Sequence, residues 1–407
     1  MKKVICLLFI IDVLLLSFVK FKVVEDEGKM DANKSFVMSF IKESVDDDEN
    51  ILISPYSVEL ALRMLMDGAS GKTKEELMSV LGERVVSDVT SEKVLVSNGL
   101  FIKDVYENGI RSEFKNDILS NYGGEVLVDS FKTPDVINNW AKERTNGMIP
   151  EIMESVNPEF VLGIANALAL DLEWHMPFSC ESTRKGLFTR RDGSQYNVAM
   201  MHDNYDTEAY GYFDNKQEIG IVIPYNEVDG KEYEYIGILP NEDIKEYIDS
   251  FDLKRLLKTK KSASSDVQVF LSMPKFSYDY TLIDFKNILE NMGLHKMFSE
   301  SEAEFYNIIS KDSLVRNNLD NLYVGEGIHK THINLNEKGT KAAAVTFFGL
   351  FGNSALGEKK NKSVYITFDR PFIYLIREVS SNEILFFGIV NEPNEWEGIT
   401  CNEWEWI

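Results

Sequence analysis

The sequence contains few of the residues that build metal centres and disulfide scaffolds. Its 407 residues include three cysteines, Cys6, Cys180 and Cys401, and five histidines. It has no His-Glu-x-x-His and no Cys-x-x-Cys motif, the spacings that bring zinc ligands together. His329 and His332 are three residues apart in an alternating segment, so their side chains should face opposite sides of a strand. We therefore predict no metal site and no cofactor, and a fold stabilised by packing.

Motifs for nucleophilic catalysis and for phosphate binding are also missing. No Gly-x-Ser-x-Gly motif is present, so the sequence offers no nucleophile elbow. The stretch "GASGKT" at 68–73 looks like a phosphate-binding loop, but that motif needs a glycine where Met66 stands. We predict that the protein is not an enzyme.

Positive charge is scarce. The chain has 43 Lys and Arg against 66 Asp and Glu, a formal net charge of −23. Such a chain repels phosphate backbones, so we expect no nucleic-acid partner. The basic stretch "LKRLLKTKKSAS" at 253–264 is interpreted as a solvated helix end and loop, although the sequence does not decide whether a heparin-like molecule assists the protein.

The N-terminus is typical of exported proteins. Two lysines precede an apolar run from Val4 to Val19, which is short for a membrane span. We expect residues 1–25 to be a cleaved signal peptide, with a signal anchor or a misassigned start as alternatives, and we expect a secreted, extracellular protein without stable membrane association. Cys6 would leave with the signal, so at most one disulfide remains. Asn33 and Asn361 begin Asn-x-Ser sequons and are candidate glycosylation sites.

No long linker or internal repeat divides the remaining chain, which predicts a single domain over 30–393. Residues 57–69 have apolar positions at helical spacing, and Thr73 three residues before Glu76 indicates a capping box at a helix start. Short β-branched and aromatic runs follow at 219–225, 233–240, 267–276, 363–368, 372–378 and 383–390. Helices early and antiparallel strands late predict an α+β fold. Residues 394–407 are expected to be a solvated acidic extension that contains tryptophan.

Several segments in a fixed order resemble the serpin family. They are "NILISPYSVELALRMLMDGASGKTKEELMSVL" at 50–81, "INNWAKERTNGMI" at 137–149, "ANALALDLEWHMPF" at 165–178, "MPKF" at 273–276, "IHKTHINLNEKGTKAAAVT" at 328–346, "FDRPFIYLI" at 368–376 and "ILFFGIVNEP" at 384–393. The chain departs from the family pattern at Asp171, Leu172 and Glu392. The resemblance spans about residues 33–393 and implies helices packed on a large central β-sheet, with smaller sheets and an exposed reactive-centre loop.

The same resemblance implies an inhibitor that a serine or cysteine endopeptidase attacks and that then traps the enzyme covalently. The cut loop inserts into the central sheet as an extra strand. A non-inhibitory binding or carrier protein on the same fold is the alternative. We expect a monomer whose partner is the target endopeptidase. Glu337, Gly339 and Thr340 match the hinge of inhibitory members, followed by Ala342, Ala343, Ala344 and Thr346.

Alternation in a strand supports this interpretation of "GTKAAAVT". Thr340, Ala342, Ala344, Thr346 and Phe348 would share one face, and the first four of these side chains are small enough to be buried. Lys341 would face the opposite side. An alanine-rich helical turn is the alternative, but Gly339 weakens a helix there. Lys341 on the buried face would leave an unpaired charge inside the protein.

The scissile bond and the sheet-opening residues are also implied by the resemblance. Thirteen residues after Thr340 stands Asn353, followed by Ser354, which would suit a legumain-type enzyme. The segment from 354 to 371 is longer than is common in the family, so other candidate residues are Leu350, Phe351 and Lys360. Ser54, Ser57, Asn166 and His329 match polar residues beneath the centre of the sheet, and Trp174 matches the tryptophan where the loop enters.

Overall fold

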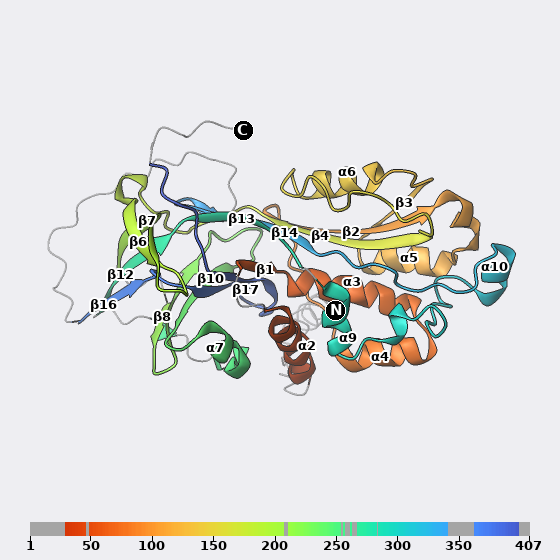
Figure 1. Ribbon diagram of the computed structural model, residues 1–407, viewed down its shortest axis with the longest axis horizontal. Coiled ribbons are helices and arrows are strands. Elements are labelled where there is room, and N and C mark those ends of the chain that lie inside the picture. Colours follow the sequence, from red (N-terminus) through yellow and green to blue (C-terminus); the bar gives the residue numbers. More distant parts are fainter. Residues whose placement is uncertain are drawn as a thin grey trace, which may run out of the picture.

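The computed structural model describes residues 29–45, 49–206, 211–253, 255–256, 261–262, 267–282, 284–340 and 362–398. The molecule is elongated in Figure 1, with β6, β7, β12 and β16 towards one end and α4, α5, α6 and α10 towards the other. The long strands β13, β14, β4 and β2 run between these two ends. The expected signal peptide, the segment 341–361 and the last nine residues lie outside the described residues.

The described helices lie mostly in the first half of the chain, as the sequence predicts. They are α2 (Lys29–Ser44), α3 (Pro55–Gly68), α4 (Gly71–Leu81), α5 (Ser112–Asn121), α6 (Asp135–Arg144), α7 (Ile244–Ser250), α9 (Phe285–Asn291) and α10 (Lys311–Arg316). Short 3-10 turns are η1 (Asp104–Gly109), η2 (Cys180–Ser182) and η3 (Lys296–Phe298).

The strands form four sheets. They are β1 (Ile51–Ile53), β2 (Val94–Lys103), β3 (Glu125–Asp129), β4 (Leu162–Leu170), β5 (Leu172–Glu173), β6 (Arg184–Thr189), β7 (Gln195–Asp206), β8 (Gly211–Asp214), β9 (Glu218–Pro224), β10 (Tyr233–Pro240), β11 (Lys261–Ser262), β12 (Val267–Pro274), β13 (Phe276–Thr281), β14 (Lys330–Leu335), β15 (Gly339–Thr340), β16 (Lys362–Thr367), β17 (Phe372–Glu378) and β18 (Ile384–Val390). Their orders are β1-β18-β17-β10-β9-β8-β11, β16-β12-β7-β6, β13-β14-β15-β5 and β3-β2-β4. Helices packed on mainly antiparallel sheets confirm the α+β prediction, with parallel pairs at β12–β16 and β2–β3.

The late strands agree closely with the sequence pattern because they are buried on both faces. Every residue of β10, β17 and β18 is buried, so an uninterrupted apolar run is the expected sequence signal. The long strands β2 and β4 were not predicted from the pattern. The β4 sequence, LGIANALAL, contains glycine, alanine and asparagine, which are poor strand formers.

The predicted capping box at Thr73 is wrong. Helix α4 begins at Gly71, so Thr73 lies inside the first turn. The hydroxyl of Thr73 accepts a hydrogen bond from the Glu304 backbone N–H at 3.0 Å. The Glu76 carboxylate accepts from the backbone N–H groups of His295 and Lys296. Both side chains therefore join α4 to a distant loop, a tertiary role that displaces the local capping pattern.

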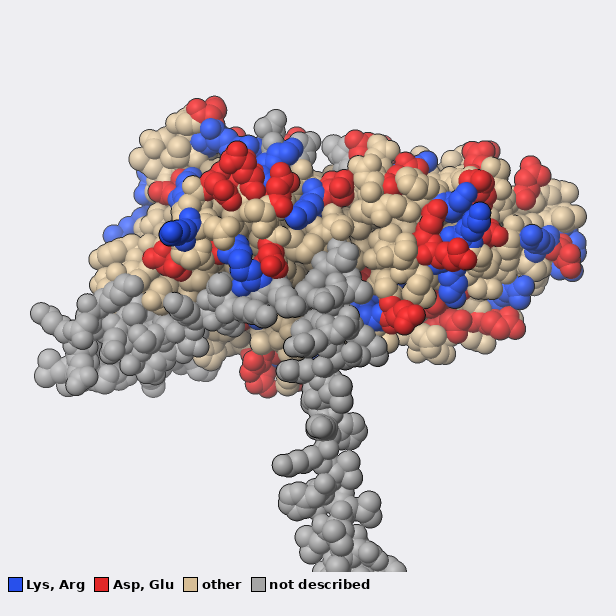
Figure 2. All heavy atoms as spheres, turned by 90° about the horizontal axis from the view of Figure 1, so that it is seen from below, with Lys and Arg blue, Asp and Glu red and all other residues tan. Residues whose placement is uncertain are grey.

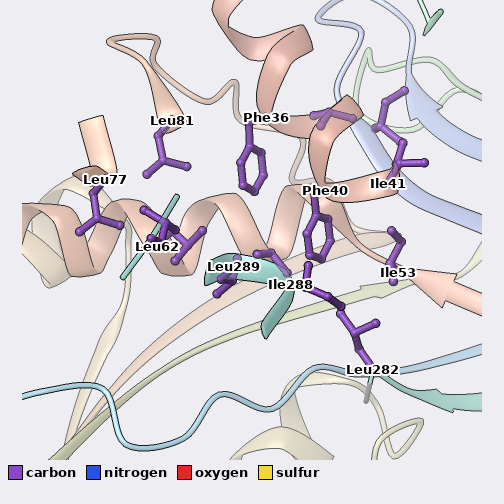
Figure 3. Packing of buried hydrophobic residues seen from close by; sticks show 14 of the residues in the cluster. Phe36, Phe40, Ile41, Ile53, Leu62, Leu77, Leu81, Leu282, Ile288 and Leu289 are labelled. Atoms are coloured by element: carbon purple, nitrogen blue, oxygen red, sulfur yellow. The ribbon is translucent and has the colours of Figure 1, made fainter. Parts of the chain in front are cut away.

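The largest apolar cluster joins the N-terminal helix to the rest of the helical end. Phe36 and Phe40 of α2 point towards α3 and α9, with Leu62 and Ile288 close by (Figure 3). The two phenylalanine rings are stacked at 5.9 Å. Burying an aromatic ring of this size contributes about 2 to 3 kcal/mol. The cluster also includes apolar side chains of α3, the helix that Ser54 caps at its N-terminus.

Acidic and basic side chains are interspersed over the face shown in Figure 2. The net charge of −23 is therefore not gathered into one acidic region on that face. Within the described ranges, no helix is long and apolar enough to span a bilayer.

Candidate functional site: a slot between two unpaired strand edges

Two long strands run side by side in the fold without pairing with each other. Strand β4 hydrogen-bonds to β2 on one side, and strand β14 hydrogen-bonds to β13 on one side. Among the described residues, the other edge of β4 has no strand partner, and the other edge of β14 meets only the two-residue strand β15. Both strands line one cavity of about 1180 Å³. We call the space between β4 and β14 the slot.

Strand β15 closes one end of the slot. Its residues Gly339 and Thr340 pair with Glu173 and Leu172 of β5, the short continuation of β4. On the other side Thr340 pairs with Leu335, the last residue of β14. The chain is therefore already inserted between the two strands over these two residues, at the mouth of the slot.

Gly339 is required at this point by the close approach of two backbones. A Cβ atom on residue 339 would lie 2.0 Å from the Leu172 carbonyl oxygen. No side chain fits in that space, so only glycine allows β15 to pair with β5 here. In the sequence Gly339 argues against a helix at this position, and the structure adds a steric reason for glycine there.

Aromatic side chains enclose Thr340, which is 1% exposed. Its hydroxyl lies 2.5 Å from the hydroxyl of Tyr225. The Tyr225 ring is stacked on Trp174, with centroids 4.6 Å apart. Burial raises the pKa of Tyr225, so the phenol remains neutral and available for a hydrogen bond. The residue at position 340 must therefore be small and uncharged.

Trp174 ties the turn before Thr340 to the sheet. Its indole N–H donates to the Asn336 carbonyl at 2.9 Å, and its backbone N–H donates to the Lys338 carbonyl at 2.8 Å. The side chain is fully buried. Trp174 thus lies beside the turn immediately before β15, and its role where the loop enters stays a prediction.

Glu337 is anchored by a separate segment, residues 178–183. The Thr183 hydroxyl donates to the Glu337 carboxylate at 2.8 Å, and the Phe178 backbone N–H donates to the Glu337 carbonyl at 2.8 Å. The Lys275 ammonium is 3.5 Å from the same carboxylate, and Glu337 is buried. A buried carboxylate needs such partners, so these contacts fix the start of the hinge.

The floor of the slot is polar at the start of α3. The Ser54 hydroxyl accepts from the Ser57 backbone N–H at 3.2 Å and caps the helix, with Pro55 at the first helical position. The Ser54 backbone N–H donates to His329 Nε2 at 3.0 Å. Burial lowers the pKa of His329 to about 4, so the imidazole is neutral and its Nε2 is an acceptor.

Asn166 lines the same cavity but does not bond to these residues. Its Nδ2 donates to Asn98 Oδ1 of β2 at 2.8 Å, while Asn98 Nδ2 donates to the Tyr122 carbonyl. The Oδ1 atom of Asn166 is buried and accepts no hydrogen bond within the described part of the chain. A buried acceptor without a partner is costly, which makes Asn166 Oδ1 a place where a new donor would be stabilising.

The predicted sheet-opening residues therefore lie together around the slot, and the described hinge residues lie at its mouth. Their functional roles stay predictions. Side chains that sequence reasoning missed are Tyr225, Asn98, Thr183 and Lys275. Lys275 lies within the quoted "MPKF" segment, but no sequence signal pairs it with Glu337 across 62 positions.

Other predicted residues fall outside the described part of the chain. Asn33 lies in α2, but its side chain is not described. The remaining ones are Ala342, Ala343, Ala344, Thr346, Leu350, Phe351, Asn353, Ser354, Lys360 and Asn361. Within the described residues, no cluster of three or more His, Cys, Asp or Glu side chains suits a metal ion.

Comparison with known proteins identifies the class to which this fold and slot belong. Residues 31–393 match the family model described as "Serpin (serine protease inhibitor)". The chain belongs to the serpin family.

Its relatives include a serpin-like protein of Thermococcus kodakarensis, 28% identical over 397 residues, which cover 91% of this chain and 87% of that protein. Human antithrombin-III is 26% identical over 407 residues, with 89% of this chain and 81% of antithrombin-III covered. The native structure of the thermophilic serpin tengpin is 31% identical, has a TM-score of 0.76, and covers 90% of this chain and 95% of its own. Human thyroxine-binding globulin in complex with its ligand shares the fold at 23% identity and a TM-score of 0.72, covering 90% of this chain and 98% of its own.

Proposed function

We propose that this protein is an irreversible inhibitor of a serine or cysteine endopeptidase that works by inserting its own loop into the slot. The observation that carries the proposal is β15, since the hinge is already paired with both edges that the rest of the loop would fill. Each added residue would satisfy backbone groups that the unpaired edges of β4 and β14 now present.

The register of β15 can be continued into the slot. Thr340 pairs with Leu172 and Leu335, so an antiparallel continuation places residue 342 opposite 170 and 333, and residue 344 opposite 168 and 331. Leu170, Leu168, Ile333 and Thr331 are all buried. Small side chains at 342 and 344 fit beside them, and the sequence has alanine at both positions.

The next inward position of that register is Thr346. It falls opposite Asn166 on β4 and opposite residue 329, the histidine just before β14. The threonine hydroxyl would reach the polar part of the slot and could donate to the unpaired Oδ1 of Asn166. Ala342 thus meets two apolar neighbours and Thr346 meets polar ones, which supports insertion in this register.

The length of the slot supports the choice of bond. In the same register, residue 350 falls opposite Leu162, the first residue of β4. A bond between Asn353 and Ser354 leaves three residues between the end of the inserted strand and the attached enzyme.

The protease nucleophile attacks the Asn353 carbonyl carbon and forms an ester or thioester, while the Asn353–Ser354 peptide bond breaks and the amine leaves with a proton. Insertion then separates that amine from the acyl bond.

We further propose that the protein acts outside the cell as a monomer, after removal of residues 1–25, and that Asn33 and Asn361 are glycosylated there. The sequence of the N-terminus and the two sequons support this part of the proposal.

The test is to incubate the purified protein with endopeptidases of the legumain, cathepsin, chymotrypsin, elastase and trypsin types and to examine the products by SDS electrophoresis. Under reducing conditions inhibition predicts an SDS-stable adduct with the mass of the protease plus that of the inhibitor without the C-terminal peptide that cleavage releases. Cleaved protein without adduct for every enzyme of the panel would instead favour a binding or carrier protein on the same fold.

A further inference from the structure

Cys180 is half of a disulfide, and its position gives that bond a consequence for the hinge. The residue is disulfide-bonded. It lies in η2, between Phe178 and Thr183, the two residues that donate hydrogen bonds to Glu337. Whatever is bonded to Cys180 is therefore attached to the segment that anchors the hinge.

The chain offers two partners for Cys180, and both lie outside the described residues. Cys6 is within the N-terminal apolar run that we expect to be removed, whereas Cys401 belongs to the C-terminal extension. A disulfide joins Cα atoms that are about 4.4 to 6.8 Å apart. The question is whether the extension leads towards η2.

The described start of the extension contacts β13 and β7. Asn394 exchanges two hydrogen bonds with the backbone of Ser277. Glu395 forms a β-bridge with Val198, and the Trp396 backbone N–H donates to the Asn197 carbonyl at 2.8 Å. Residues 394–396 thus run along β7, while Asn394 and Glu395 stay exposed. The expectation of a solvated acidic extension stays a prediction.

The same strand β7 also packs against η2. Gly398 has a φ of +99°, a conformation that favours glycine and allows the chain to turn. Cys401 follows Trp396 by five residues, a reach of about 17 Å at most. Residues 394–396 are therefore held beside β7, the strand that also packs against η2.

We propose that Cys180 is bonded to Cys401, which ties the C-terminal extension covalently to residues 178–183, the segment that anchors Glu337. We call this covalent link the strap. Cleavage of the bond by an external dithiol transfers two electrons and two protons to the two sulfur atoms, and the dithiol becomes a disulfide. The freed segment then anchors Glu337 less firmly. The cross-link itself is independent of the proposed function, whereas its effect on loop insertion rests on it.

Peptide mapping under non-reducing conditions tests the cross-link. Cleavage of the full oxidised chain after glutamate releases residues 174–181, with Cys180, and residues 398–403, with Cys401. The proposal predicts one species that contains both peptides and separates on reduction. A species that joins residues 174–181 to a peptide with Cys6, or a freely alkylated Cys180, would overturn it.

Hydrogen exchange tests the effect on the hinge without any protease. The double variant Cys180→Ser/Cys401→Ser removes the strap, and Ser179→Ala, an exposed neighbour in the same segment, is the matched control. We expect the Phe178 amide, which donates to Glu337, to exchange about fivefold faster in the double variant, the effect of weakening one hydrogen bond. The control should retain the exchange rate of the unaltered chain.

Reversible reduction of the folded, unaltered protein repeats the comparison without mutation. A dithiol should produce the same acceleration, and reoxidation should restore slow exchange. Unchanged exchange after reduction would refute the hold on the hinge even if the cross-link is present. Neither measurement uses a protease. A negative result therefore counts against the strap alone, and failure to trap proteases counts against the proposed inhibition alone.

Discussion

The hydroxyl groups of Tyr225 and Thr340 lie 2.5 Å apart at the mouth of the slot, where both side chains are buried. Residue 340 is therefore enclosed before any protease acts. The start of the hinge already lies inside the sheet. Position 340 therefore accepts only a small, uncharged side chain in the native protein, and the same limit would hold after loop insertion.

Thr340→Arg should convert the inhibitor into a substrate. A guanidinium in this apolar, enclosed position would cost several kcal/mol, so β15 would leave the sheet. The protease would then cut the loop and be released before the loop inserts. The measurement is the ratio of cleaved protein to SDS-stable adduct. Thr340→Ser, which keeps the hydroxyl beside Tyr225, is the control and should still trap the enzyme. Full trapping by the arginine variant would contradict insertion from this residue.

Thr346→Val should weaken trapping without changing the size of the side chain. In the proposed register the hydroxyl of Thr346 meets Asn166, and the loss of one hydrogen bond should slow insertion about two- to fivefold. The number of inhibitor molecules consumed per trapped enzyme should rise accordingly. Thr346→Ser should behave as the unaltered chain, and equal values for valine and serine would refute the register.

The stability of the protein should fall in mild acid because of His329. Burial lowers the pKa of this imidazole from 6.5 to about 4. Between these values the unfolded chain binds a proton that the folded protein does not, so the free energy of unfolding decreases as the pH falls through this window. The full effect is about 3 kcal/mol.

Denaturant unfolding at a series of pH values between 7 and 4 measures this effect. A matched variant is compared because the carboxylates also titrate in this range and contribute equally to both proteins. His329→Gln keeps an acceptor for the Ser54 N–H but does not titrate. The difference between the two proteins should therefore grow as the pH falls below 6.5. Parallel pH profiles would show that His329 is not the group responsible.

Asn353→Ala should abolish inhibition of an enzyme that cleaves after asparagine. The reason is chemical, since the alanine side chain lacks the amide that such an enzyme recognises. Mass spectrometry, after reduction, of the C-terminal peptide that a trapping protease cuts off locates the bond directly. Leu350→Ala is the comparison, and loss of trapping there, with Asn353→Ala unaffected, would place the bond after Leu350 or Phe351.

The sequence predicts the parts of this structure in which local pattern and tertiary environment agree. Strands β10, β17 and β18 are buried on both faces, so their composition alone identifies them. Strand β4 was missed because one of its edges faces the slot and its side chains include alanine, glycine and the polar Asn166. Its composition reflects a role in the slot rather than strand propensity.

The arrangement of the site depends on contacts between distant residues, which local patterns do not encode. Ser54 and His329 are 275 positions apart, and Tyr225 and Thr340 are 115 apart. Family resemblance pointed to Ser54, His329 and Trp174 without showing how they meet. Tyr225 and Asn98 had no motif, and only the fold reveals that they complete the mouth and the floor of the slot.

The two unpaired edges of β4 and β14 also bear on how long the protein remains active. If the loop inserts as proposed, a chain with unfilled edges on the described strands β4 and β14 has an arrangement of lower free energy available to it even before cleavage. Its working lifetime is then set by the height of the barrier between the two arrangements rather than by an equilibrium. On storage, activity should decay with first-order kinetics and a steep temperature dependence while the protein remains folded.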